Sequence, residues 1–360
     1  MKKKVVIGLS GGVDSSVAAY LLKEQGYDVI GVTMQIWQDN DSVQQDEDSC
    51  SGIVAVEDAK RVANLLDIPF YVVNFRDEFR QAVINYFISE YQRGYTPNPC
   101  NVCNRRIKWE ALLGKAKEMG AEYIATGHYA RIKQLENGRY TIQNSITAQK
   151  DQTYALYNLT QEQLSRTLMP VGAYSKDEIR QIAERIHLPV AHKQDSQDIC
   201  FIPDKDYAAF IEQETGKKSV PGNFVDENGV ILGKHKGIEH YTVGQRKGLG
   251  LTAPTPLFVK SLNPEKNEVV ICQSEGLFAD TCLVTDMNYM AIDRLAPGES
   301  IEAIGKVRYS HQGAPCVITA QENGEIKCRF KETQRAMTPG QAAVFYRDDY
   351  VLCGGTIARE

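Results

Sequence analysis

The sequence predicts an α/β protein in which a parallel sheet covered by helices is followed by a small central domain and a C-terminal β-barrel. In the first half, apolar runs of strand length alternate with segments of helical periodicity. Glycine becomes frequent after about residue 211, and short alternating segments take over from about residue 281. We therefore expect three domains, over residues 1–210, 211–280 and 281–360.

The predicted parallel sheet rests on four short apolar runs: Lys4–Leu9, Tyr27–Met34, Ile68–Val73 and Glu122–Thr126. Val17 to Leu22 have helical spacing before Gly26, and residues 57–66 favour a second helix. Strands joined through helices form parallel sheets, and their ligands bind at the carboxyl ends of the strands. Three residues are expected at such ends: Ser10, Met34 and Gly127.

Turn and cap signals organise the rest of the chain. Residues 154–210 favour helices, and Ser175 with Glu178 forms a capping box for a helix through Ile186. Asp226–Gly229 is typical of a hairpin turn. The barrel prediction rests on three segments near Asn-Gly and Pro-Gly turns: Val317–Gln321, Ile326–Phe330 and Ala342–Tyr346.

Composition is that of a soluble globular protein of 360 residues, with 42% hydrophobic and 24% charged residues. No run of 18 apolar residues exists, so we expect no membrane association and a cytoplasmic location. Nine cysteines without an export signal indicate reduced thiols. The net charge of −5 argues against broad, non-specific binding of nucleic acid but allows a local basic surface.

The segment Ser10–Ser16, SGGVDSS, separates the first strand from the first helix. Gly11 and Gly12 can adopt positive φ, and the amides at the helix start can face an anion. Asp14 could hold Mg²⁺ beside phosphates. The Walker pattern GxxxxGK[ST] is absent, and the segment resembles the loop of the ATP pyrophosphatases. The alternative is a glycine-rich turn capped by serines.

Two cysteines, Cys100 and Cys103, lie in the segment 97–104, PNPCNVCN. Its two prolines predict a loop until about Arg105, with both thiols just before a helix start that lowers their pKa. The alternative, a structural zinc site, needs further ligands, and no second CxxC exists. On local sequence alone, Cys200 between isoleucine and phenylalanine is typical of a buried small side chain.

Seven motifs occur along the chain: SGGVDSS (10–16), NPCxxCN (98–104), ATGHYA (125–130), KDQTYAL (150–156), SQDICF (196–201), YTVGQRKGLG (241–250) and RYSH (308–311). In this order, the chain resembles the bacterial tRNA-specific 2-thiouridylases over essentially its whole length. The resemblance implies an ATP pyrophosphatase (Rossmann-like) domain. It also implies 2-thiolation of the wobble uridine, position 34 of tRNA, with ATP cleaved to AMP and pyrophosphate.

The resemblance also assigns residues. It makes Cys200 the carrier of sulfur as a persulfide and Cys103 the nucleophile that resolves the reaction. It places ATP at Gly8, Leu9, Ser10, Gly11, Gly12, Val13, Asp14, Ser15, Met34 and Gly127. It places the target uridine beside Asn98, Pro99 and Cys100. The tRNA contacts that it implies are His128, Lys150, Asp151, Gln152, Arg308, Tyr309 and Gln341.

Three of these positions have competing interpretations. Many members of the family carry aspartate where this chain has Cys100, so Cys100, Cys103 and Cys200 could instead bind an iron–sulfur cluster, which we do not favour. His128 is either a hydrogen-bonded structural residue or a substrate contact. Residues 245–248, QRKG, form either a solvated basic turn or a phosphate-contacting loop.

The expected cofactors are ATP and Mg²⁺, with no metal site built from protein ligands alone. The expected partners are tRNA and a sulfur donor, either a cysteine desulfurase or a sulfur-relay protein. Two other functions compete: an ATP pyrophosphatase that amidates a small molecule, and a non-catalytic RNA-binding protein. Residue 2 is lysine, so the N-terminal cysteine of a glutaminase is absent. The tRNA isoacceptors, the donor and the oligomeric state stay open.

Overall fold

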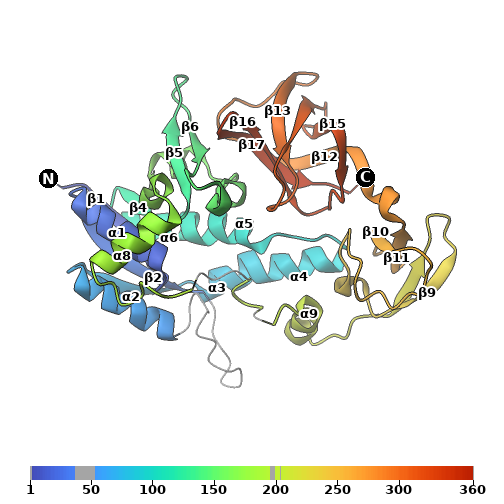
Figure 1. Cartoon of the computed structure of the whole chain (residues 1–360), viewed down its shortest axis with the longest axis horizontal. Coiled ribbons are helices and arrows are strands. Elements are labelled where there is room, and N and C mark those ends of the chain that lie inside the picture. Colours follow the sequence, from blue (N-terminus) through green and yellow to red (C-terminus); the bar gives the residue numbers. More distant parts are fainter. Residues whose placement is uncertain (1, 37–52, 195–198, 203, 360) are drawn as a thin grey trace.

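A five-stranded parallel sheet organises the N-terminal half of the protein, whose structure is a computed structural model that describes residues 2–36, 53–194, 199–202 and 204–359 (Figure 1). The strand order is β3-β2-β1-β4-β7. The bounds are β1 Lys4–Gly8, β2 Asp28–Gln35, β3 Phe70–Asn74, β4 Tyr123–Ala125 and β7 Thr167–Leu168. All four pairings are parallel, so the prediction of a parallel sheet is confirmed.

Helices cover both faces of this sheet. Successive residues of a strand point to opposite faces, so apolar side chains of β1 are buried on both sides. Val5 and Ile7 pack against α1 (Val13–Glu24), α2 (Ile53–Leu65) and α8 (Lys176–Arg185). Val6 packs on the other face, against Trp109 and Leu112. The capping box of Ser175 and Glu178 is present, and Gly26 has a φ of 86° just after α1, as predicted.

Two long helical segments lie between β3 and β4 in the chain. One comprises α3 (Arg76–Phe79), a π-helical stretch over Arg80–Ile84 and α4 (Asn85–Gln92). The other comprises α5 (Pro99–Cys103), a second π-helical stretch over Asn104–Ala111 and α6 (Leu112–Glu118). The stretch predicted to be helical after residue 154 is only partly so, with α7 (Gln161–Ser165), α8 and α9 (Tyr207–Thr215).

The C-terminal domain is the predicted barrel. Its strand order is β12-β15-β14-β13-β16-β17, and β12 pairs with β17 to close it. The bounds are β12 Phe278–Tyr289, β13 Ser300–Lys306, β14 Ala314–Ala320, β15 Ile326–Arg335, β16 Ala342–Arg347 and β17 Tyr350–Ile357.

A hairpin that sequence reasoning missed links the barrel to the N-terminal half. It consists of β5 (Ala130–Gln134) and β6 (Tyr140–Asn144), and Gln143 pairs with Tyr350 of β17. The overlooked signal was the turn Asn137-Gly138, where Gly138 has a φ of 80°. Side-chain hydrogen bonds add to the link, because Thr141 Oγ1 donates to the Val351 carbonyl at 2.6 Å.

The central domain is a four-stranded sheet in the order β10-β11-β8-β9. Its strands are β8 Gly222–Val225, β9 Ile231–His235, β10 Phe258–Asn263 and β11 Glu268–Cys272. The predicted hairpin turn is confirmed, since the Asp226 carboxylate accepts hydrogen bonds from the amides of Asn228 and Val230. In the part of the chain that the structure describes, no helix is long and apolar enough to cross a membrane.

Candidate functional site

The glycine-rich loop between β1 and α1 adopts a conformation that its sequence requires. Gly11 has a φ of 72°, and a Cβ atom built there would lie 2.4 Å from the carbonyl oxygen of Ala55. Gly12 is extended and caps α1, and Ser16 Oγ donates to its carbonyl at 2.7 Å. The first amides of α1 therefore open onto a loop that has no room for a side chain at Gly11.

The other residues predicted to bind nucleotide surround this loop. A Cβ atom at Gly127 would lie 2.6 Å from the amide nitrogen of Ser15, so the end of β4 touches the start of α1. Met34 closes the opposite side, because its Cε lies 3.5 Å from the position of a Cβ at Gly8. The ends of three neighbouring strands, β2, β1 and β4, thus lie together at one edge of the sheet, which is where the strand-end rule places ligands.

Sequence reasoning missed two residues at this loop. Lys176 Nζ lies 2.8 and 2.9 Å from the two carboxylate oxygens of Asp14, and the Tyr129 hydroxyl donates to the same carboxylate at 2.7 Å. The Lys176 side chain is 12% exposed. Its separation of 162 residues from Asp14 left no sequence signal, although Tyr129 lies within the ATGHYA motif.

The cysteine segment is helical, and the prediction of a loop up to Arg105 is wrong. α5 begins at Pro99, and the Asn98 side chain caps it by accepting a hydrogen bond from the Cys100 amide at 3.1 Å. The physical reason is that proline fits the first helical position, where its missing N–H costs nothing and its φ is already helical. Cys100 therefore lies in the first turn of a helix and Cys103 at the start of the second, with Cys100 exposed and Cys103 buried.

Cys103 and Cys200 meet the same apolar cluster. Cys103 is one of its buried members, and the half-buried Cys200 packs against it. The cluster includes the aromatic rings of Phe79, Phe87 and Phe201, with Phe201 next to Cys200 in the chain. Two cysteines 97 positions apart are thereby brought to one part of the fold. Residues 195–198, which precede Cys200 in its motif, lie outside the described residues.

The described residues include no group of three or more His, Cys, Asp or Glu side chains placed to hold a metal ion. Asp14 is the only acidic residue of its loop. A magnesium ion there would need most of its oxygen ligands from a bound nucleotide.

Cys100 faces a polar neighbourhood built from segments far apart in the sequence. The Tyr309 hydroxyl donates to the carbonyl of Asp151 at 3.3 Å. Burial raises the pKa of Tyr309, the Asp151 carboxylate and the Cys100 thiol act in the same direction, and Lys150 opposes them. These groups therefore lie close enough to interact. Tyr309 is still 51% exposed, so its ring is available at the surface.

Four predicted RNA contacts are engaged with the protein backbone. Asp151 accepts from the Ser145 amide at 2.8 Å, and Gln152 accepts from the Tyr129 amide at 2.8 Å. Gln341 donates to the Thr96 carbonyl at 2.7 Å, and Arg308 donates to the Arg335 carbonyl at 2.8 Å. Asp151, Gln152 and Gln341 thus hold loops in place. Arg308 keeps further guanidinium donors for other partners.

His128 is held at the end of β4. Its Nδ1 lies 2.8 Å from Thr126 Oγ1, and its ring lies 5.4 Å from the Trp109 ring. Burial lowers the pKa of His128 well below its ordinary value, and Lys108 acts in the same direction. The imidazole is therefore neutral at neutral pH. This geometry is compatible with either interpretation of His128, the structural residue or the substrate contact.

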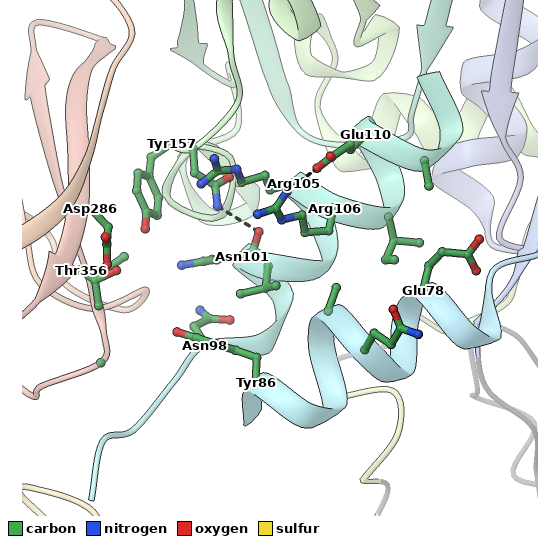
Figure 2. Close-up of a pocket in the computed structure, with 18 residues that line it drawn as sticks. Glu78, Tyr86, Asn98, Asn101, Arg105, Arg106, Glu110, Tyr157, Asp286 and Thr356 are labelled. Atoms are coloured by element: carbon green, nitrogen blue, oxygen red, sulfur yellow. Dashed lines mark hydrogen bonds and ion pairs between the residues drawn. The ribbon is translucent and has the colours of Figure 1, made fainter. Parts of the chain in front are cut away.

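A pocket of about 660 Å³ lies between the helices and the barrel (Figure 2). Figure 2 shows Asp286 and Thr356 of the barrel facing Asn98 and Asn101 of the cysteine helix. Of the residues predicted for the site, only Asn98 lines it, and the pocket shares Val102 and Ile107 with the surroundings of the apolar cluster that contains Cys103. The buried Oδ1 atom of Asn101 has no hydrogen-bond partner in the part of the chain that the structure describes.

Family models match the three parts of the chain. Residues 3–204 match the tRNA methyl transferase HUP domain, and residues 208–273 match the tRNA methyl transferase PRC-barrel domain. Residues 279–357 match the aminomethyltransferase beta-barrel domain. The fold and the strand-end site therefore define a three-part protein with a HUP-type catalytic domain.

Full-length relatives narrow this class. A tRNA-specific 2-thiouridylase MnmA of Lachnoclostridium phytofermentans is 60% identical, with 99% of this chain and 100% of the relative aligned. One of Clostridium perfringens is 55% identical, over 99% of this chain and 98% of the relative. One of Clostridium botulinum is 53% identical over the whole of both chains. The chain belongs to the family of tRNA-specific 2-thiouridylases.

Proposed function

We propose that the protein is a transferase that replaces the oxygen at C2 of the wobble uridine of tRNA, position 34, with sulfur at the expense of ATP. The observation that carries this proposal is the convergence of Cys103 and Cys200 on one apolar cluster. That cluster lies in the domain whose strand ends hold the phosphate-type loop. Membership of the 2-thiouridylase family supports it.

ATP is needed because a carbonyl oxygen of a uracil is a poor leaving group. Transfer of AMP to this oxygen makes it a good one and releases pyrophosphate. The amides that start α1 face the position where the phosphates would lie, and Gly127 packs so closely on Ser15 that a side chain at Gly127 would not fit. Asp14 is the carboxylate that would hold Mg²⁺, which would neutralise phosphate charge.

Cys103 and Cys200 would carry out the sulfur transfer. The terminal sulfur of a Cys200 persulfide attacks C2, and AMP leaves. The Cys103 thiolate then attacks the inner sulfur of Cys200, which breaks the S–S bond and releases the 2-thiouridine. A Cys103–Cys200 disulfide remains, and two electrons from an external thiol reduce it. A cysteine desulfurase or a sulfur-relay protein reloads Cys200.

The tRNA substrate would lie across Cys100, Lys150 and Tyr309, which the fold brings together at an exposed surface. A base in a single-stranded loop is flipped out at low cost, so position 34 can reach the thiols. The neutral His128 could donate or accept a hydrogen bond there without adding charge. Gln341 would act through Thr96, the carbonyl that it holds just before the cysteine helix.

Reconstitution tests the proposed function directly. Purified protein is incubated with ATP, a tRNA transcript, cysteine, a cysteine desulfurase and dithiothreitol, and the digested RNA is examined by mass spectrometry. We expect 2-thiouridine together with AMP and pyrophosphate. Turnover of ATP with a small amine or acid but without RNA would overturn the proposal in favour of a small-molecule ligase.

Cys100 separates the persulfide mechanism from one that uses a cluster. If sulfur travels on Cys200, Cys100→Ser slows the reaction and does not stop it, because Cys100 is an exposed neighbour of Cys103. Aerobically purified, iron-free protein should then be fully active. Loss of activity and iron together in this variant would instead establish the three cysteines as cluster ligands.

A further inference from the structure

We propose that Arg359 is a positioning residue, which holds the cysteine helix α5 in place against the barrel through residues 94–96. These residues lie between the end of α4 and the start of α5, and Cys100 and Cys103 follow them in the chain. The Arg359 guanidinium donates a hydrogen bond to the carbonyl of Arg93, which is 266 positions away in the sequence. The inference rests on the proposed function, because it concerns the step that the cysteines carry out.

The end of α4 is a place where a cation is favoured. α4 ends at Gln92, and Arg93 is its C-cap. The last carbonyls of a helix have no partners within the helix and carry partial negative charge. Gly94 has a φ of 70° and turns the chain out of the helix, with its amide donating to the Tyr91 carbonyl at 2.9 Å. Arg359 therefore caps α4 with a hydrogen bond and with a favourable charge.

The ring of Tyr95 binds the same guanidinium. Arg359 Cζ lies 4.7 Å from the centre of the ring, and Arg93 Cζ lies 5.1 Å from it. A guanidinium is attracted to the face of an aromatic ring and packs flat on it. Arg93 is also paired with Glu90 at 2.7 Å, which offsets the charge of the second guanidinium. Arg359 thus holds both the backbone at Arg93 and the half-buried ring of Tyr95.

Gly94 shows how closely the surrounding elements meet. A Cβ atom built there would lie 2.9 Å from Arg359 Nη2 and 3.2 Å from the Cβ of Leu262 in β10. Figure 1 shows the end of α4 close to β10 and below the barrel. Helix α4, the central domain and the chain beyond β17 therefore converge on this residue. The backbone at Gly94 has no room to shift unless one of them moves.

The barrel holds the other end of the segment. The Thr96 amide donates to the Pro339 carbonyl at 2.9 Å, and the Gln341 side chain donates to the Thr96 carbonyl. The same loop is tied to the strand that leads to Arg359, because the Ile357 amide donates to the Gln341 carbonyl at 2.8 Å. Residues 94–96 are therefore held at both ends by one part of the barrel, just before α5 begins.

This arrangement fixes where the cysteines lie relative to the barrel. A displacement of about 1 Å of a reacting group can lower a rate about a hundredfold. Arg359 acts on the backbone that precedes α5, whereas the nucleotide loop lies between β1 and α1. Its loss should therefore lower the rate constant of thiolation, kcat, and leave the affinity for ATP unchanged.

The experiment measures steady-state thiolation of a tRNA transcript by full-length wild type, R359M, R359K, Y95L and R359M/Y95L, and ATP binding by calorimetry. We expect R359M to lower kcat about tenfold, with the KM for tRNA and the Kd for ATP within about twofold of wild type. R359K should recover part of the loss, because lysine keeps the charge and lacks the planar group. The double variant should lose less than the product of the two single effects, since Arg359 acts through Tyr95.

Arg139 supplies the matched control. Its guanidinium donates to the carbonyls of Met290 and Tyr289 at 2.9 and 2.7 Å, so it also links the N-terminal half of the chain to the C-terminal part by arginine–carbonyl hydrogen bonds. R139M removes such a link without changing residues 94–96. We expect its kcat to stay within about twofold of wild type even where its melting temperature falls as far as that of R359M.

Hydrogen exchange gives a readout that does not depend on catalysis. The amides of residues 97–104 should exchange faster in R359M than in wild type and R139M. Equal losses of kcat in R359M and R139M would show a general loosening of the barrel and overturn the inference, as would unchanged kcat and exchange in R359M. Absence of 2-thiouridine with the wild-type protein would instead count against the proposed function, so the two failures are distinguishable.

Discussion

The phosphate-type loop and the cysteine site are assembled in different ways. The loop is formed by residues that follow one another in the chain, from the end of β1 to the start of α1. Its shape depends on Gly11 and the serines beside it. The cysteine site joins the helices α3, α4 and α5 to the segment around Cys200 and to Tyr309 of the C-terminal domain. The local site therefore depends on the residues of one short motif, whereas the assembled site depends on packing between segments far apart in the sequence.

The largest expected effect separates the two cysteines. Cys200→Ser should abolish persulfide formation and sulfur transfer, while ATP-dependent adenylation of the RNA continues in the intact loop. Cys103→Ser should allow the persulfide to form and leave it unresolved. Alkylation and intact-mass measurement should show an increment of about 32 Da, one sulfur atom, on Cys200. Retained thiolation by Cys200→Ser would contradict the assignment of its role.

Gly11→Ala tests how strictly the local site depends on backbone shape. At a φ of 72° an alanine costs about 1–2 kcal/mol, and its Cβ would meet the Ala55 carbonyl at 2.4 Å. We expect ATP binding to be lost and the melting temperature to fall. Gly120→Ala is the matched control, because Gly120 has a φ of 71° and open space around its Cβ.

Gly120→Ala should show the strain alone, with ATP affinity unchanged. Calorimetry and thermal unfolding of both variants distinguish the two contributions. Equal ATP affinities for Gly11→Ala and Gly120→Ala would mean that the loop does not hold the nucleotide.

Arg308→Ala probes the assembled site, at smaller expected effect. The logarithm of the tRNA binding constant falls linearly with the logarithm of the salt concentration. Loss of one phosphate contact should reduce the magnitude of this slope by about one unit, while the affinity for ATP stays nearly normal. Arg329, an exposed barrel arginine paired with Asp280, supplies the control variant Arg329→Ala. Filter binding at several salt concentrations measures the slope. Identical slopes for both variants would mean that the barrel surface at Arg308 does not contact the RNA.

Features that depend on residues close together in the sequence could be predicted from it. The strands, the loop, the capping box of Ser175 and the turn at Asp226 all follow from short-range preferences. Contacts across the chain were not predictable in this way. Lys176 reaches Asp14 and Gln341 reaches Thr96 only because the packed elements bring them together. The prediction for the segment around Cys100 was wrong for a different reason. Proline disfavours the interior of a helix, but it is well suited to the first helical position.

The smallest expected effect concerns His128 and pH. Its pKa in the folded protein is lowered by burial, so it stays neutral while the unfolded chain takes up a proton below about pH 6.5. The unfolded state then binds more protons, and stability contributed by the neutral ring is lost as pH falls. His128→Asn should therefore lose less stability than wild type between about pH 6.5 and 5.5, by at most about 1 kcal/mol. His192, 87% exposed, is the control position. Urea unfolding at the two pH values measures the difference, and an identical pH dependence in His128→Asn and wild type would mean that the ring is solvated and charged in the native state.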